Sequence, residues 1–236
     1  MSSQPQPQPP PTLTSLLTHL LPHTTLLHAP SPSSPSAHLT STISSLQLHP
    51  TLEAALHLAN ADLPSAHFLV RHMQAAPAVE GMLLHAILHR CEGDFANARA
   101  WLGDVGDVCA GWVAKKKGVE RLGEDMMGRV KLEGEERGLL GFVYGEGSED
   151  GGERLVDDVE GFRERCKGRK GREGEKEEDE IEGRIRRELE MVVEWCRGKF
   201  GDGRWVDASS AWVRHGDEVR QVAEDMVSGN KGFRKF

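Results

Sequence analysis

The sequence predicts a mostly α protein, an irregular helical bundle with one tetratricopeptide-like helical hairpin. Three observations predict it. Leucines recur at helical spacing near the N-terminus, a Gly-Asp pair stands where one helix would end and the next begin, and apolar residues at helical spacing mark a longer helix near the C-terminus. Hydrophobic residues make up 38% of the 236 positions, which supports a modest core. No apolar run approaches the roughly 18 residues that a membrane span needs.

Composition changes along the chain and predicts its organisation. All 12 prolines lie at or before Pro77, whereas most of the 26 glycines and most charged residues come after residue 114. This asymmetry has two explanations, two regions of different role or a skew in nucleotide composition, and the sequence leaves both open. We expect a disordered tail, a helical core domain, a glycine-rich connection, and C-terminal helices that pack on the core and include a charged loop at 168–180. These four regions span 1–12, 13–112, 113–152 and 153–236.

The first helix is predicted by leucines that form one stripe at helical spacing, namely Leu13, Leu16, Leu17, Leu20 and Leu21. Pro22 should interrupt this helix, which then resumes through Leu26 and Leu27. A Pro- and Ser-rich loop follows at 29–36. Short helices are expected at about 37–47 and 51–60.

The densest apolar stretch predicts three consecutive helices, over 62–74, 77–92 and from 95 onward. Gly93 suits the left-handed position that ends a helix, and Asp94 suits the N-cap of the next one. This junction is similar to the helix–turn–helix of a tetratricopeptide repeat. Only one copy is visible, so a repeat array is not expected.

The second half of the chain is less regular. Residues 115–152 are glycine-rich and charged, and the apolar run 139–144 suggests a short strand or a buried turn. Amphipathic spacing predicts helices over 153–166, 181–199 and 217–227.

Part of the chain resembles a group of uncharacterised fungal proteins. The segments that carry the resemblance are HFLVRHMQ (67–74), EGMLLHAILHR (80–90), EGDFANARAW (92–101) and DMVSGNKGFRKF (225–236). A fainter similarity links them to bacterial proteins with a Trp-His-Ala-Ile-x-His-Arg pattern, from which Leu84 departs. The resemblance implies a helical, intracellular fungal protein. It implies no activity and no catalytic residues.

One polar cluster has the spacing of a metal site. On a helix, His85, His89 and Glu92 share an arc of about 60°, because their spacing is His-x3-His-x2-Glu. Two imidazoles and one carboxylate with open positions suit a divalent Zn, Fe or Mn ion. The preceding helix offers His67 and His72 as a further ligand or a proton shuttle.

Arg90, on the same helix, is a candidate to hold an anionic substrate. The alternative is that these histidines are hydrogen-bonded packing residues of a helical bundle, because two histidines at this spacing arise by chance in a His-rich segment.

Two functions therefore stay open. The first is an interaction, scaffold or ligand-binding protein with another protein as partner. The second is a metal-dependent enzyme of hydrolase or oxygenase type. We favour the first, because the second needs a geometry that the sequence does not force. The net charge of −8 argues against nucleic acid as a partner, no membrane partner is expected, and we expect a cytoplasmic or nuclear location.

Overall fold

The computed structural model describes residues 11–28, 39–167 and 175–213, and these residues fold into helices. Within them the only β pairing is one isolated bridge between Trp112 and Arg121. The predicted helix at 217–227 lies outside the described residues, as does nearly all of the predicted tail. The helices of the first half are α1 (Leu13–Leu20), η1 (Leu21–His23), α2 (Thr40–Ser45), α3 (Pro50–Ala59), α4 (Leu63–Val70), α5 (Val79–Glu92) and α6 (Phe95–Cys109). Those of the second half are α7 (Glu124–Val130), α8 (Leu139–Tyr144), α9 (Gly151–Cys166), α10 (Glu175–Phe200) and η3 (Ala208–Ala211).

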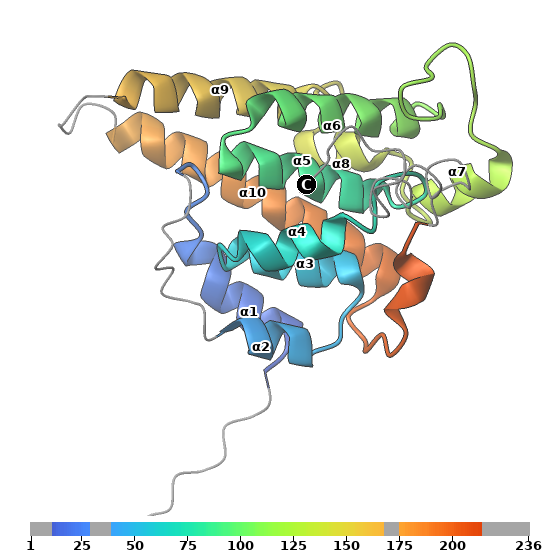
Figure 1. Cartoon of the computed structure of the whole chain (residues 1–236), viewed down its shortest axis with the longest axis horizontal. Helices are drawn as coiled ribbons and strands as arrows, with labels where there is room; N and C mark the ends of the chain where they lie inside the picture. Colours follow the sequence, from blue (N-terminus) through green and yellow to red (C-terminus); the bar gives the residue numbers. More distant parts are fainter. Residues whose placement is uncertain (1–10, 29–38, 168–174, 214–236) are drawn as a thin grey trace, which may run out of the picture.

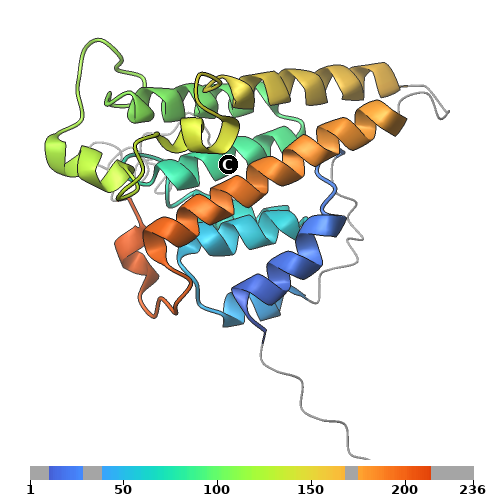
Figure 2. The same cartoon turned by 180° about the vertical axis from the view of Figure 1, so that it is seen from behind.

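The long helix α10 organises the packing of the other helices. It crosses the molecule from end to end, with α9 along one side and with α3 and α1 toward the other (Figure 2). Helices α5 and α6 form an antiparallel pair, and α9 covers α6 (Figure 1). One connected apolar core runs through these helices, with Leu56, Leu84, Val105 and Trp195 among its most buried members. No helix in the described ranges is both long and apolar enough to cross a bilayer.

The N-terminal helix follows the predicted leucine stripe and stops at the predicted place. Thr12 caps α1 through a reciprocal capping box with Ser15, and the helix tightens to a 3-10 turn at Pro22. The predicted resumption is wrong, because residues 24–28 are not helical. Leu26 and Leu27 are nevertheless buried, so these two leucines indicated a place in the hydrophobic core and not a helix.

The predicted junction between the two central helices is confirmed. Gly93 adopts the left-handed conformation with φ of 87°, and the Asp94 side chain accepts a hydrogen bond from the Asn97 backbone N–H. Helix α4 is shorter than predicted, since it ends at Val70 rather than near residue 74. The helical hairpin is thus present, and its likeness to a tetratricopeptide repeat stays a prediction.

The second half holds more helix than predicted. Residues 139–144 form helix α8 instead of a strand or turn, and α7 lies in the segment expected to be a glycine-rich connection. Helix α10 begins at Glu175, inside the predicted charged loop. Its first turn carries three glutamates, and negative charge near a helix N-terminus is stabilising.

Candidate metal centre

Three histidines from two helices converge at one point. His67 projects from α4, and His85 and His89 project from successive turns of α5. One potential ligand atom from each lies within 4.8 Å of the others. The sequence predicted that His85 and His89 share a face. The packing of α4 against α5 adds His67 to it.

The closest pair already has the spacing of two ligands on one ion. The Nε2 atoms of His67 and His85 are 3.3 Å apart. Two nitrogens bound tetrahedrally to Zn²⁺ at about 2.0–2.1 Å are separated by roughly 3.3 Å. Without an ion, the two imidazoles share one N–H···N hydrogen bond. An inward movement of His89 would complete a three-nitrogen site.

Glu92 occupies a different position from the one predicted for a direct ligand. Its Oε2 atom is 3.1 Å from Nδ1 of His89, and its Oε1 atom is 3.7 Å from Nδ1 of His67. The carboxylate therefore accepts the Nδ1–H of His89, which leaves the Nε2 lone pair of that ring available. A carboxylate behind a ligating histidine is a common way to fix the tautomer and the ring orientation.

Burial keeps the central imidazole neutral. His85 is 3% exposed, and its Nδ1 atom is buried without a hydrogen-bond partner. Burial, joined by the neighbouring imidazoles, lowers the pKa of His85 to about 3. Burial also lowers the pKa of His67. Because only neutral imidazole binds a metal ion, these rings lose little to protonation near neutral pH.

The ring of Trp101 packs against the ring of His85, a contact that sequence reasoning missed. The two rings stack at 4.4 Å, and His85 also stacks on His89 at 4.8 Å. A signal for this contact was present, because His85 and Trp101 each lie eight positions from Gly93. In an antiparallel hairpin that turns at Gly93, residues equally far from the turn face each other.

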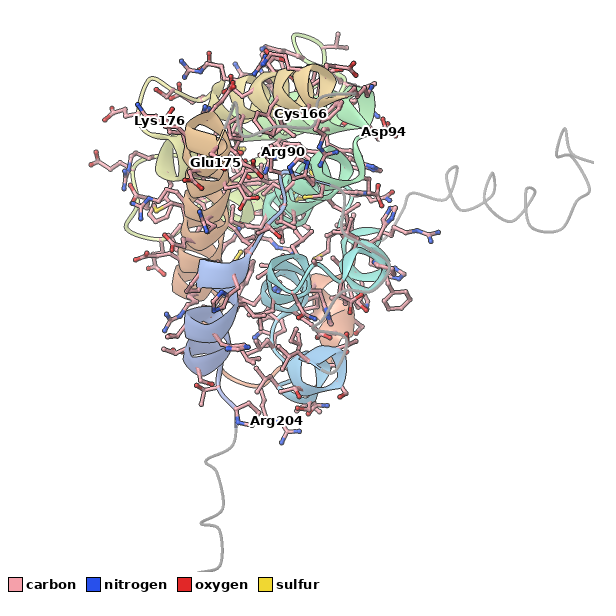
Figure 3. The ribbon with its side chains drawn as sticks, turned by 90° about the vertical axis from the view of Figure 1, so that its left-hand side faces the viewer. Arg90, Asp94, Cys166, Glu175, Lys176 and Arg204 are labelled. Carbon is pink, nitrogen blue, oxygen red and sulfur yellow. The ribbon has the colours of Figure 1, made fainter. Side chains whose placement is uncertain are left out.

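Two other predicted site residues lie elsewhere. His72 follows the end of α4, is exposed, and packs on the ring of Trp212 at 4.7 Å rather than on the three histidines. The predicted substrate role of Arg90 gains no support, because its guanidinium is buried and paired with Glu188. Figure 3 shows Arg90 inside the helical body, whereas Asp94 lies at its edge.

Comparison with known proteins adds no relative. No family model, no curated protein and no solved structure matches the chain. The resemblance to the fungal group therefore stays a prediction.

Proposed function

We propose that the protein binds a divalent transition metal ion, best matched by Zn²⁺, through His67, His85 and His89. The observation that carries the proposal is the 3.3 Å separation of two Nε2 atoms from different helices, with the third imidazole close by. A pair of hydrogen-bonded packing histidines needs only two rings. Here three rings from two helices meet, with one potential ligand atom of each within 4.8 Å of the others.

The set of donor atoms favours zinc over iron. Glu92 lies against the Nδ1 atoms of His67 and His89, so the donors that converge are three imidazole nitrogens. Non-haem iron oxygenases use two histidines and one carboxylate as direct ligands. Three histidines with one open position are one of the ligand sets that catalytic zinc enzymes use. This supports the hydrolase form of the enzyme hypothesis over the oxygenase form.

The open position of such a site would face solvent. The side chains of His67 and His89 are 34% and 12% exposed, so water can reach the cluster. A zinc-bound water has a pKa near 7 in enzymes and acts as a nucleophile. We assign no substrate, because the described residues around the cluster do not define one.

The interaction hypothesis lacks a comparable observation. Such a protein should present a contiguous apolar surface to its partner. The large hydrophobic residues that are well exposed in the described part of the chain are Phe68, Val119 and Val206. They come from three separate segments, and protein binding therefore stays a prediction.

Metal titration tests the proposal. Protein freed of metal is titrated with Zn²⁺ by calorimetry and with Co²⁺ by visible absorption, which reports tetrahedral coordination. We expect one ion per chain. The variant His67→Gln is the sharpest probe because its side chain is partly exposed and its replacement should leave the core intact. We expect at least a tenfold loss of affinity.

A second pair of histidines provides the matched control. His19 and His23 are also four residues apart, with ring centroids 6.2 Å apart, and both are exposed. The double variant His19→Gln/His23→Gln should bind as the wild type does. The proposal is wrong if the wild type binds no ion, or if His67→Gln binds as tightly as the wild type.

A further inference from the structure

A second site lies where the chain folds back after α10, and it is independent of the metal proposal. Residues 201–213 return along the body: the Trp205 backbone N–H donates to the Gln47 carbonyl, and the Val213 N–H donates to the His72 carbonyl. Between this segment and the helices lies a cavity of about 290 Å³. Seven residues of its wall matter here: His49, Glu80, Arg129, Lys199, Phe200, Trp205 and Trp212.

Flat rings form much of the wall of this cavity. His49 stacks face to face on Phe200, with ring centroids 3.6 Å apart and planes 3° apart. Trp205 meets His49 edge-on at 4.4 Å, and Trp212 is part of the same wall. Aromatic walls of this kind hold flat apolar ligands by stacking and by burial of apolar surface.

The wall also contains one acceptor that the protein leaves unused. Glu80 is fully buried, and its Oε1 atom takes both available donors, Nε1 of Trp195 at 2.8 Å and Nζ of Lys199 at 2.5 Å. The Oε2 atom has no hydrogen-bond partner. A buried acceptor without a partner is unfavourable, so a ligand N–H that reaches this oxygen would be favoured.

The charges around the cavity determine the kind of ligand. Lys199 neutralises Glu80, and Arg129 adds a further positive charge at the wall, which disfavours a cationic ligand. The free carboxylate oxygen disfavours an anion. The volume is just below the range of about 300–1,000 Å³ typical of ligand pockets, so the ligand is small.

We propose that this cavity binds a small, neutral, flat nitrogen heterocycle whose ring N–H donates to Oε2 of Glu80. The aromatic rings of Trp205, Trp212 and Phe200 would contact its faces and edges. Binding requires neither the three histidines nor a metal ion.

Two ligands that differ only at the donor test this proposal directly. Indole and benzofuran have the same shape, but indole has a ring N–H where benzofuran has an oxygen. Each is titrated into metal-free protein while the indole N–H resonances of the five tryptophans are followed by NMR. We expect indole to shift the resonances of Trp205 and Trp212, leave Trp112 unchanged, and bind at least fivefold more tightly than benzofuran.

Two variants separate the cavity from other apolar surfaces. Trp212→Leu removes part of the wall without touching a buried charge and should weaken indole binding at least fivefold. Trp112→Leu, which alters a ring that packs under Arg121 away from the cavity, should leave it unchanged. The proposal is overturned if indole does not bind up to its solubility limit, if benzofuran binds equally well, or if Trp212→Leu has no effect.

Discussion

Arg90 of α5 and Glu188 of α10 form a bidentate ion pair in the interior of the protein. The Nη1 atom donates to Oε1 at 2.9 Å, Nη2 donates to Oε2, and each side chain is 2% exposed. The Tyr144 hydroxyl donates to the same carboxylate at 2.6 Å. This cluster joins α5, α8 and α10. The arginine that the sequence offered as a substrate contact is therefore a structural link between helices.

Removing only the arginine should be costly. Arg90→Met leaves the Glu188 carboxylate buried without its counter-ion, and we expect a loss of about 3–5 kcal/mol in the free energy of unfolding. Urea denaturation measures the loss. The double variant Arg90→Met/Glu188→Gln removes both charges but keeps an acceptor for Tyr144, so it should be more stable than Arg90→Met alone. A double variant that is less stable than the single one would contradict this account.

Substitution of two helical glycines by alanine should change the stability of the protein in opposite directions. A Cβ atom on Gly81 of α5 would lie 2.3 Å from Cβ of the buried Met73, whereas one on Gly183 of α10 would meet nothing within 4 Å. Gly81→Ala should cost about 2 kcal/mol through overpacking. Gly183→Ala should add about 0.5–1 kcal/mol, because alanine loses less backbone entropy in a helix. Thermal unfolding of both variants measures this. A destabilising Gly183→Ala would contradict the expectation.

The parts of the fold that the sequence predicted well are those decided locally. The ends of the central helices depend on the left-handed Gly93 and the capping Asp94, and the shared face of His85 and His89 depends only on helix geometry. Helix α8 was missed because six consecutive apolar or small residues fit a strand, a turn or a helix equally well. Its packing against α10 decides between them.

In the candidate site, too, the features that the sequence did not predict are those that depend on the packing of helices. The contact between His67 and His85, and the placement of Glu92 behind two rings, depend on how α4 packs on α5. The sequence also extended α4 past its true end. Because α4 ends at Val70, His72 lies beyond the helix. Its ring packs on Trp212 and does not provide the ligand that was expected from either His67 or His72. No spacing rule relates Arg90 to a partner 98 residues away.

His49 should make the protein less stable in mild acid. Burial, with a smaller contribution from the nearby Lys199, lowers the pKa of His49 to about 4 in the folded state from 6.5. The unfolded chain therefore takes up a proton at this position at a higher pH than the folded protein does. The contribution to stability is complete above pH 6.5 and is lost progressively as pH falls toward the folded pKa.

A pH series with one variant isolates this effect. His49→Asn keeps a side-chain acceptor at the N-cap of α3, where His49 accepts from the Thr51 N–H, but cannot titrate. Between pH 7 and 5 the wild type should lose about 2 kcal/mol more than the variant in the free energy of unfolding. Urea denaturation at each pH provides the comparison. If the free energies of unfolding of the wild type and the variant fall by the same amount between pH 7 and 5, His49 does not cause the loss of stability.

Glu92 should tune the metal site without binding the ion itself. In Glu92→Gln the side-chain carbonyl can still accept the Nδ1–H of His89, so the ring orientation is kept while the negative charge is lost. Glu92→Ala removes the acceptor as well. Loss of such a partner typically lowers metal affinity about 10–100-fold.

We expect the affinity for Zn²⁺ to decrease in the order wild type, Glu92→Gln, Glu92→Ala, with an unchanged Co²⁺ absorption spectrum in Glu92→Gln. A direct ligand would behave differently, because both variants would then lose the coordinating carboxylate, and the neutral amide oxygen of glutamine is a poor replacement for it. Equal losses in the two variants, together with a shifted Co²⁺ spectrum, would assign Glu92 to the ion itself and restore the two-histidine, one-carboxylate set.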